Sequence, residues 1–139
     1  MYGLLILDNK ILVTHEHRGD MEMTKFPGGG LEWGEGLADC LRREFREELD
    51  LKIEVGDLFY TNEFLQLSAF NPLHQLHSFY FRVHSVSSVP EHYFGTRADL
   101  LQRKQVFEWK EISSINPEDD FTFPIDRIVA AKIRSAQSL

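Results

Sequence analysis

Short apolar segments separated by polar turns run along most of the chain, and this pattern predicts a domain built mainly from β-strands. Five segments are rich in β-branched, aromatic and other apolar residues, and we expect strands at Gly3–Leu7, Lys10–Glu16, Leu51–Phe64, Leu76–Val86 and Gln105–Lys110. Asp8 and Asn9 provide a hairpin turn between the first two strands. Gly56 and Asp57 interrupt the third strand and predict a break or bulge there.

Helical periodicity marks two further segments. One runs from about Glu35 to Leu49, and the other runs from Pro124 to about Ser135, where proline suits the first turn. The segments His17–Lys25, Gln66–Gln75 and Ser87–Lys104 are polar or rich in turn formers, and we expect them to be mostly irregular. Many strands with one central and one terminal helix predict an α/β (α+β) fold in which helices flank a mixed β-sheet.

Length and composition favour one ordinary globular domain. The chain has 139 residues, of which 42% are apolar, and no repeat or linker divides it, so a single domain over residues 1–139 is expected. The net charge of −7 argues against a protein that coats nucleic acid, but bound cations can still attract a small anionic substrate. No apolar run approaches the roughly 20 residues that span a bilayer. A lone Cys40 and no signal-peptide pattern lead us to expect a cytoplasmic protein.

The acidic residues of the central helix stand apart from its other charges. Taking about 100° per residue, the apolar stripe consists of Leu37, Leu41, Phe45 and Leu49. The solvent-facing side consists of Asp39, Arg42, Arg43 and Arg46. Glu44 and Glu48 instead fall at about −20° and 20° from Leu37, and Glu47 falls at about −80°. The three acids therefore lie on or beside the apolar side.

Carboxylates that converge at a partly buried edge are unfavourable without a compensating cation. Mg²⁺ takes oxygen ligands and shares them with substrate phosphates, so acids at i, i+3 and i+4 suit this ion. Glycines in the turn Pro27–Gly30, just ahead of the helix, would let a backbone carbonyl reach the same metal. The alternatives are a solvated helix face with i,i+4 ion pairs and an ordinary glycine loop.

Turn and helix together resemble the Nudix box, Gly-x5-Glu-x7-Arg-Glu-U-x-Glu-Glu-x-Gly-U, in which U is a bulky apolar residue. Gly29 and Glu35 take the first two specified positions, and Arg43–Leu51 takes the others. Eight of the nine specified positions match if Phe45 is accepted as bulky and apolar. Asp50 replaces the last glycine, where we expect a left-handed helix cap that aspartate tolerates better than most residues.

The resemblance implies a fold, an α/β/α sandwich around a mixed sheet. It also implies a hydrolase function. Nudix proteins hydrolyse a nucleoside diphosphate linked to another group, with Mg²⁺ or Mn²⁺. The implied metal ligands are Glu44, Glu47, Glu48 and the Gly28 carbonyl. Arg43 would orient the glutamates through ion pairs, Glu35 would brace the turn, and Glu47 or Glu48 would take the proton from the attacking water. The implied catalytic residues are thus Arg43, Glu44, Glu47 and Glu48.

One departure from the family keeps a second hypothesis open. Many Nudix enzymes add a glutamate from a loop near the late strand, but residues Gln102–Val106 contain none. Glu91 and Asp99 are candidates, although an ordinary solvated loop acid is the expectation for each. A Nudix-fold module that senses a ligand without turnover is therefore the alternative to an enzyme.

Candidate substrate contacts come from outside the box. Arg18 and Lys25 precede the glycine turn and are candidates to bind substrate phosphate, although ordinary solvated charges are an equal expectation. The sequence His15-Glu16-His17 resembles a ligand pair but is expected to be exposed and idle. Aromatic residues that either line a nucleotide pocket or belong to the core are Phe59, Tyr60, Phe64, Phe70 and Tyr80. The substrate stays open among nucleoside triphosphates, ADP-ribose, nucleotide sugars and dinucleoside polyphosphates, and a homodimer is common in such proteins.

Overall fold

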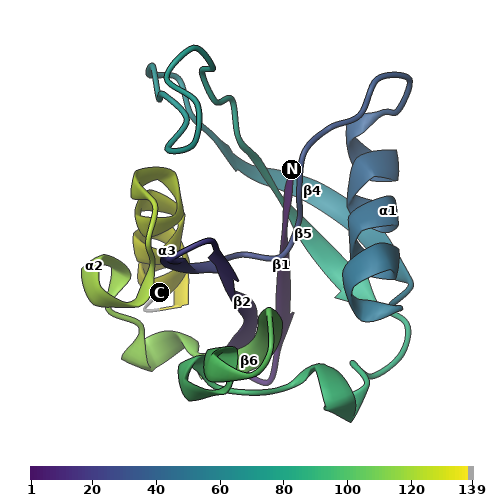
Figure 1. Ribbon diagram of the computed structural model, residues 1–139. Coiled ribbons are helices and arrows are strands. Elements are labelled where there is room, and N and C mark those ends of the chain that lie inside the picture. The colour runs from purple at the N-terminus through teal and green to yellow at the C-terminus, as the bar shows by residue number, and fades with distance from the viewer. Residues whose placement is uncertain (138–139) are drawn as a thin grey trace.

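A mixed β-sheet with helices on both sides forms the body of the protein. The structure, a computed structural model, describes residues 1–137. The sheet lies between α1 (Leu37–Leu49) on one side and α3 (Pro124–Gln137) on the other, with the short α2 (Pro117–Asp120) near α3 (Figure 1). This arrangement confirms the predicted α/β (α+β) sandwich. In this part of the chain, no helix is both long and apolar enough to cross a membrane.

The sheet contains both parallel and antiparallel pairs. Its strands are β1 (Tyr2–Leu7), β2 (Lys10–Arg18), β3 (Met21–Lys25), β4 (Ile53–Thr61), β5 (Phe79–Ser85) and β6 (Gln105–Glu111). They follow the order β3-β2-β1-β5-β4, and β6 also pairs with β2. β1 and β5 are parallel, whereas β1–β2, β2–β3, β2–β6 and β4–β5 are antiparallel. The long β2 therefore pairs with three strands, β1, β3 and β6.

One predicted irregular segment is a strand. The expectation for His17–Lys25 was wrong, because β2 continues to Arg18 and β3 begins at Met21. Gly19 takes a positive φ of 62°, which lets the chain reverse tightly between the two strands. Met23 is buried against the core, so packing on one face outweighs the polar composition of the segment.

Most other predicted elements are present with shifted ends. α1 begins at Leu37 rather than at about Glu35, because Gly36 is its N-cap. β4 and β5 are shorter than expected, and residues 62–78 leave the sheet between them. A register shift between Val55 and Leu58 confirms the bulge in β4. Short helices that the sequence did not predict are α2 and the 3₁₀ helices Glu91–Tyr93, Arg97–Leu101 and Ile112–Ser114.

Each face of the sheet has its own hydrophobic core. The core under α1 includes Leu12, Cys40, Leu41, Phe45, Leu49 and Phe107. The core under α3 includes Ile11, Val13, Phe26, Phe121, Ile125 and Val129. Alternation along β2 explains this division, because Leu12 faces one side of the sheet and its neighbours face the other. The apolar stripe predicted for α1 is buried at Leu41, Phe45 and Leu49, and Leu37 is partly buried against the same core.

Asp50 ends α1 in the left-handed conformation that the sequence predicts. Its φ and ψ angles are 48° and 40°. The Asp50 backbone N–H donates to the Arg46 carbonyl at 3.0 Å, and the Leu51 N–H donates to the Phe45 carbonyl at 3.3 Å. These bonds satisfy carbonyl groups at the helix end and direct the buried Leu51 into the core.

Replacing Asp50 should change stability in a direction set by backbone conformation. We expect Asp50→Gly to raise the free energy of unfolding by up to about 1 kcal/mol, because glycine adopts positive φ without a Cβ clash. Asp50→Val should lower it by about 1 kcal/mol or more, because a β-branched residue fits this region poorly. Urea unfolding of the three proteins measures both changes, and equal stability of the glycine and valine variants would contradict the cap.

Candidate active site

The glycine turn is attached to the first strand by backbone hydrogen bonds. The Gly3 N–H donates to the Pro27 carbonyl and the Gly29 N–H donates to the Met1 carbonyl, both at 2.9 Å. Gly28 takes a φ of 148°, and a Cβ at this position would overlap the Met1 carbonyl. Only glycine fits such a close approach between two backbones. The turn is therefore held at the edge of the sheet, directly before α1.

Arg43 joins this turn to α1. Its guanidinium donates twice to Glu35, with Nε to Oε2 at 3.0 Å and Nη2 to Oε1 at 2.7 Å, and Nη2 also donates to the Gly30 carbonyl at 3.0 Å. Arg43 holds the pKa of Glu35 at about 2, helped by a hydrogen bond from the Glu32 N–H. Two parallel charge-assisted bonds fix both distance and orientation. The bracing contact implied for Glu35 is thus present.

The same guanidinium reaches the box glutamates. Arg43 Nη1 lies 2.9 Å from Glu44 Oε1 and 3.3 Å from Glu47 Oε2. The Glu44 side chain is 12% exposed and packs against Gly29, where any Cβ would overlap its carboxylate. Glu47 is 58% exposed and lies at the outer edge of the cluster. Arg43 itself, which the helical wheel placed on the solvent face, is instead largely covered by these acids.

Glu48 faces inward, toward β2 and β3. Burial raises the pKa of Glu48 to about 7, and the nearby Glu44 and Glu16 act in the same direction, whereas Lys25 opposes them. Glu16, on β2, forms an ion pair with Lys25, on β3, at 2.8 Å. The sequence predicted no role for Glu16 itself. Its strand alternation, which puts Glu16 on the α1 side of the sheet, was the signal that could have identified it.

The donor chemistry of these side chains fits a hard divalent ion. Across residues 1–137, no group of three His, Cys, Asp or Glu residues is arranged so that it could hold a metal ion. Arg43 pairs with Glu44 and Glu47 at once. The raised pKa of Glu48, which follows from burial and like charge, is the property expected of carboxylates that lack a balancing cation. Carboxylate and backbone carbonyl oxygens are the ligands that Mg²⁺ prefers.

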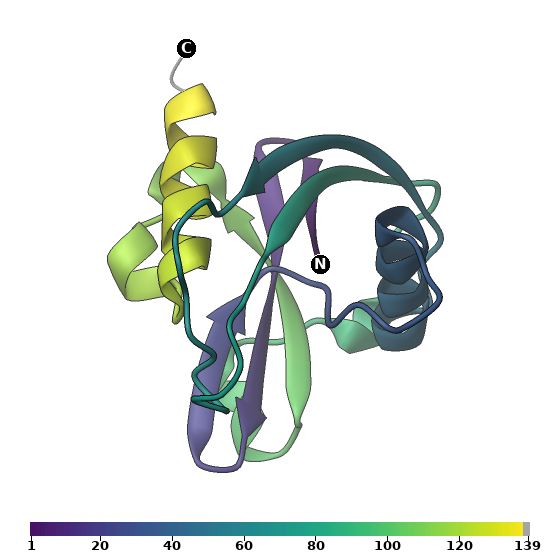
Figure 2. The ribbon, with the colours of Figure 1, turned by 90° about the horizontal axis from the view of Figure 1, so that it is seen from above.

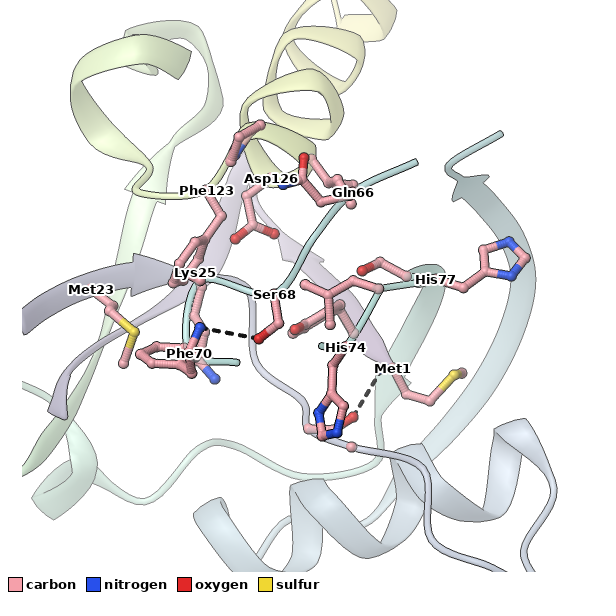
Figure 3. A pocket seen from close by; sticks show the side chains of 18 of the residues that line it. Met1, Met23, Lys25, Gln66, Ser68, Phe70, His74, His77, Phe123 and Asp126 are labelled. Atoms are coloured by element: carbon pink, nitrogen blue, oxygen red, sulfur yellow. Dashed lines mark hydrogen bonds between the residues drawn. The ribbon is translucent and has the colours of Figure 1, made fainter. Parts of the chain in front are cut away.

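A pocket of about 980 Å³ opens beside the glycine turn. Its walls come from the turn, β2, β3, the start of α3 and residues 66–80 (Figure 3). The structure brings Arg18 and Lys25, the two predicted substrate contacts, into this wall. The Arg18 guanidinium lies 4.2 Å from the centre of the Phe70 ring, and Phe70 contacts Phe123 edge-on at 6.3 Å. Arg18 therefore lies over an aromatic ring at the pocket wall while it stays exposed to solvent.

Residues 62–78, which we name the β4–β5 arm, form the outer wall of the pocket. Figure 2 shows the arm extending from the sheet toward β2 and β3. Asn62 is 4% exposed and ties the neck of the arm, because its amide donates to the carbonyls of Phe64 and Leu76 and accepts from the Ser78 N–H. The arm is thus anchored at its base by one buried side chain.

Asp126 is a buried acid in the pocket that the sequence analysis missed. It is 3% exposed, Tyr80 Oη donates to its Oδ1 at 2.6 Å, and Figure 3 shows the carboxyl directed into the pocket. Burial raises the pKa of Asp126 to about 7, although the Tyr80 hydrogen bond and Lys25 oppose the shift. The signal in the sequence was a carboxylate beside Ile125, on the apolar stripe of α3. Tyr80, which Tyr2 stacks against at 5.1 Å, is both a core residue and a pocket residue.

Other predicted candidates have structural explanations. His15 is buried rather than exposed, with Nδ1 2.7 Å from Thr24 Oγ1 and Nε2 3.2 Å from Glu108 Oε2. Asp99 accepts from the Thr96 N–H at 2.7 Å and caps a 3₁₀ helix. Glu91 lies in the first turn of the preceding 3₁₀ helix.

The α/β/α sandwich, the glycine turn and the acidic helix together define a Nudix-type protein. The chain matches the family model of the NUDIX domain over residues 2–130, and it belongs to this family. A search of curated proteins found no match.

Solved structures give the same result for the fold. The chain is similar to a NUDIX hydrolase from Nitrosomonas europaea, with TM-score 0.73 and 22% identity over 98% of this chain and 86% of that one. It is similar to MutT from methicillin-resistant Staphylococcus aureus 252, with TM-score 0.65 and 25% identity over 97% and 93%. An ADP-ribose pyrophosphatase from Streptococcus suis has TM-score 0.58 and 15% identity over 99% and 90%. Family match and neighbours together support a Nudix hydrolase.

The raised pKa of Asp126 makes stability depend on pH. The unfolded chain releases this proton near pH 4, whereas the folded protein releases it only near pH 7, so the free energy of unfolding should fall as pH rises through this range. Asp126→Asn keeps an acceptor for Tyr80 and removes the titration. Urea unfolding at pH 5 and pH 8 measures the effect. We expect the free energy of unfolding of the variant, relative to that of the wild type, to be higher at pH 8 than at pH 5 by about a few kcal/mol. Parallel pH curves for the two proteins would show that Asp126 ionises normally.

Proposed function

We propose that this protein is a metal-dependent hydrolase that cleaves a diphosphate bond in a nucleoside diphosphate linked to another group. The observation that carries the proposal is the packing of the Glu44 carboxylate against Gly29, because the glycine turn also lines a large pocket. Acids from a helix and backbone oxygens from a turn meet there, next to space for a substrate. Such an arrangement suits chemistry on a phosphate held at the boundary between the two.

The proposed cofactor is Mg²⁺ or Mn²⁺. Glu44, Glu47, Glu48 and the Gly28 carbonyl would hold it, and the bound ion would neutralise the diphosphate and lower the pKa of an attacking water. Arg43 would keep Glu44 and Glu47 oriented, as it does in the structure through its two ion pairs. Glu47 or Glu48 would receive the proton from water.

The pocket supports a nucleotide-type small molecule as substrate. Arg18 and Lys25 offer positive charge for phosphate oxygens. Phe70 and Phe123 offer ring surfaces for a flat group, and Asp126 offers a carboxyl that can pair with a polar ring edge. A volume of about 980 Å³ lies at the upper end of small-molecule pockets and leaves room for a second group beyond the nucleotide.

A second candidate is a ligand-sensing module without turnover. The observation that favours it is the lack of an acid in Gln102–Val106, where related enzymes carry one. The two proposals differ in a single measurement, the release of phosphate or nucleoside monophosphate from a panel of nucleoside triphosphates, ADP-ribose, nucleotide sugars and dinucleoside polyphosphates. Release that requires a divalent metal supports the enzyme, whereas tight binding without release supports the sensor.

Hydrolysis should require a divalent metal and the box acids. We expect activity with Mg²⁺ or Mn²⁺ and its loss with a chelator, because metal-free carboxylates cannot neutralise the diphosphate. Glu48→Gln and Glu47→Gln should each lower kcat by about 100-fold or more while the protein stays folded. Glu54→Gln, which changes an exposed acid on β4, is the matched control. Near-normal turnover in a box variant with an unchanged melting temperature would remove that residue from the mechanism.

Acids outside the box should contribute little to proton transfer. Glu91 and Asp99 belong to 3₁₀ helices, so Glu91→Gln and Asp99→Asn should change kcat by less than about threefold. Deleting a general base normally costs roughly 100- to 10,000-fold. A loss of that size in either variant, with metal affinity unchanged, would move the base from α1 to this loop. Thermal unfolding checks the Asp99 variant for loss of its helix cap.

A further inference from the structure

Lys25 lies between acidic groups from three elements. Its side chain is 17% exposed and contributes to the pocket wall, where Figure 3 shows it near Ser68 and Phe70. Its ammonium lies 2.8 Å from Glu16 Oε1. The same positive charge opposes the rise in pKa that burial causes for Glu48, on α1, and for Asp126, on α3. Lys25 therefore has several acidic neighbours, and among the described residues it forms its ion pair with Glu16.

The pairing follows from the register of the sheet. Thr14 is the cross-strand neighbour of Lys25, and Glu16 is the neighbour of Met23, so Glu16 and Lys25 share one face of β2 and β3. On its other side β2 pairs with β6, and Glu16 lies opposite Gln105. Gln105 is neutral, and its side-chain amide donates to Thr14 Oγ1 at 2.9 Å. On this face of β2 and β3, the acid that pairs with Lys25 is therefore Glu16.

Glu16 also stabilises the charged form of Lys25. Burial alone would lower the pKa of Lys25, but the charge and hydrogen bond of Glu16 outweigh it, so that the pKa is raised. A lysine without this partner would either lose its proton more readily or turn toward the next acid, which is Glu48. Pairing with Glu48 would occupy a carboxylate that we assign to the metal.

We propose that Glu16 is a positioning residue that holds the Lys25 ammonium away from Glu48 and at the pocket wall, where Lys25 binds a phosphate of the substrate. The inference rests on the proposed function for the identity of the site, but its binding step does not require turnover. When a diphosphate enters, Lys25 exchanges part of its contact with Glu16 for phosphate oxygens, and Glu48 stays available to the metal. No bond is made or broken in this step.

The first test measures diphosphate binding without metal or chemistry. ADP is titrated calorimetrically into wild-type protein in the presence of a chelator. We expect Glu16→Gln and Lys25→Met each to weaken binding by about tenfold, and the double variant to bind no more weakly than either, because both changes disable the same contact. Glu22→Gln removes an exposed acid from β3 with the same change in net charge and should bind as the wild type does.

A second test separates positioning from a purely structural ion pair. Glu16→Asp keeps the charge and should recover part of the ADP affinity, whereas thermal unfolding should differ little among these proteins, because a single ion pair at a partly exposed site contributes little to stability. In steady-state hydrolysis, Glu16→Gln should raise KM by about tenfold, and Mn²⁺ affinity of the substrate-free protein should fall as Lys25 turns to Glu48.

Several results would overturn the inference. These are no ADP binding by the wild type, unchanged ADP affinity in Glu16→Gln, or additive losses in the double variant. A fall in kcat with unchanged ADP affinity would assign Glu16 to proton transfer instead of positioning. If the expected pattern of ADP affinities appears but no compound of the panel is hydrolysed, the proposed enzyme fails while the role of Glu16 stands. If hydrolysis occurs and Glu16→Gln matches the wild type in both assays, only the positioning role fails.

Discussion

The double hydrogen bond between Arg43 and Glu35 is the contact on which the candidate site depends. It joins Glu35, in the segment between the glycine turn and α1, to Arg43, in the middle of α1, with donor–acceptor distances of 3.0 and 2.7 Å. A planar guanidinium and a planar carboxylate can pair this way in few orientations, so the bond fixes rotation as well as distance. The remaining Arg43 nitrogen reaches Glu44 and Glu47. One side chain thereby sets the geometry of turn, helix and acids together.

The core under α1 explains why the acids of this helix can lie close to one another. Phe45, Leu41 and Leu49 anchor one face of the helix in the core under α1. The adjacent positions then have little freedom to turn outward, because a rotation of the helix would expose those apolar side chains. The packing of the apolar face thus offsets the repulsion between the like charges on the adjacent positions. Functional sites commonly combine local electrostatic strain with a rigid support of this kind.

Local patterns in the sequence predicted much of the fold and of the box. The apolar stripe of α1, the left-handed Asp50 cap and the β4 bulge depend on short-range preferences and were confirmed. β3 was missed because it is stabilised by pairing with β2. The local composition of a strand does not show which other strand it pairs with.

The parts of the pocket that the sequence could not predict depend on tertiary contacts. Asp126 and Tyr80 are 46 residues apart in the chain, yet a 2.6 Å hydrogen bond joins them. Glu16 is an ordinary strand residue until the register of β2 and β3 puts it against Lys25. The family pattern identified the acidic helix, but substrate walls come from long-range packing and vary independently of that pattern.

The direct passage of β3 into the glycine turn has a mechanical consequence. Lys25, Phe26, Pro27 and Gly28 are consecutive, and Phe26 is fully buried, stacked on Phe121 at 4.7 Å and edge-on to Tyr80 at 5.9 Å. The distance between Lys25 and the glycine turn is therefore limited by the covalent backbone, and the buried Phe26 side chain holds this segment in place. The β4–β5 arm opposite is tied at its neck by Asn62 and reaches the other walls of the pocket through the contacts of Phe70 with Arg18 and Phe123. Phe26 thus fixes the spacing between Lys25 and the glycine turn, whereas the position of the opposite wall depends on a few side-chain contacts.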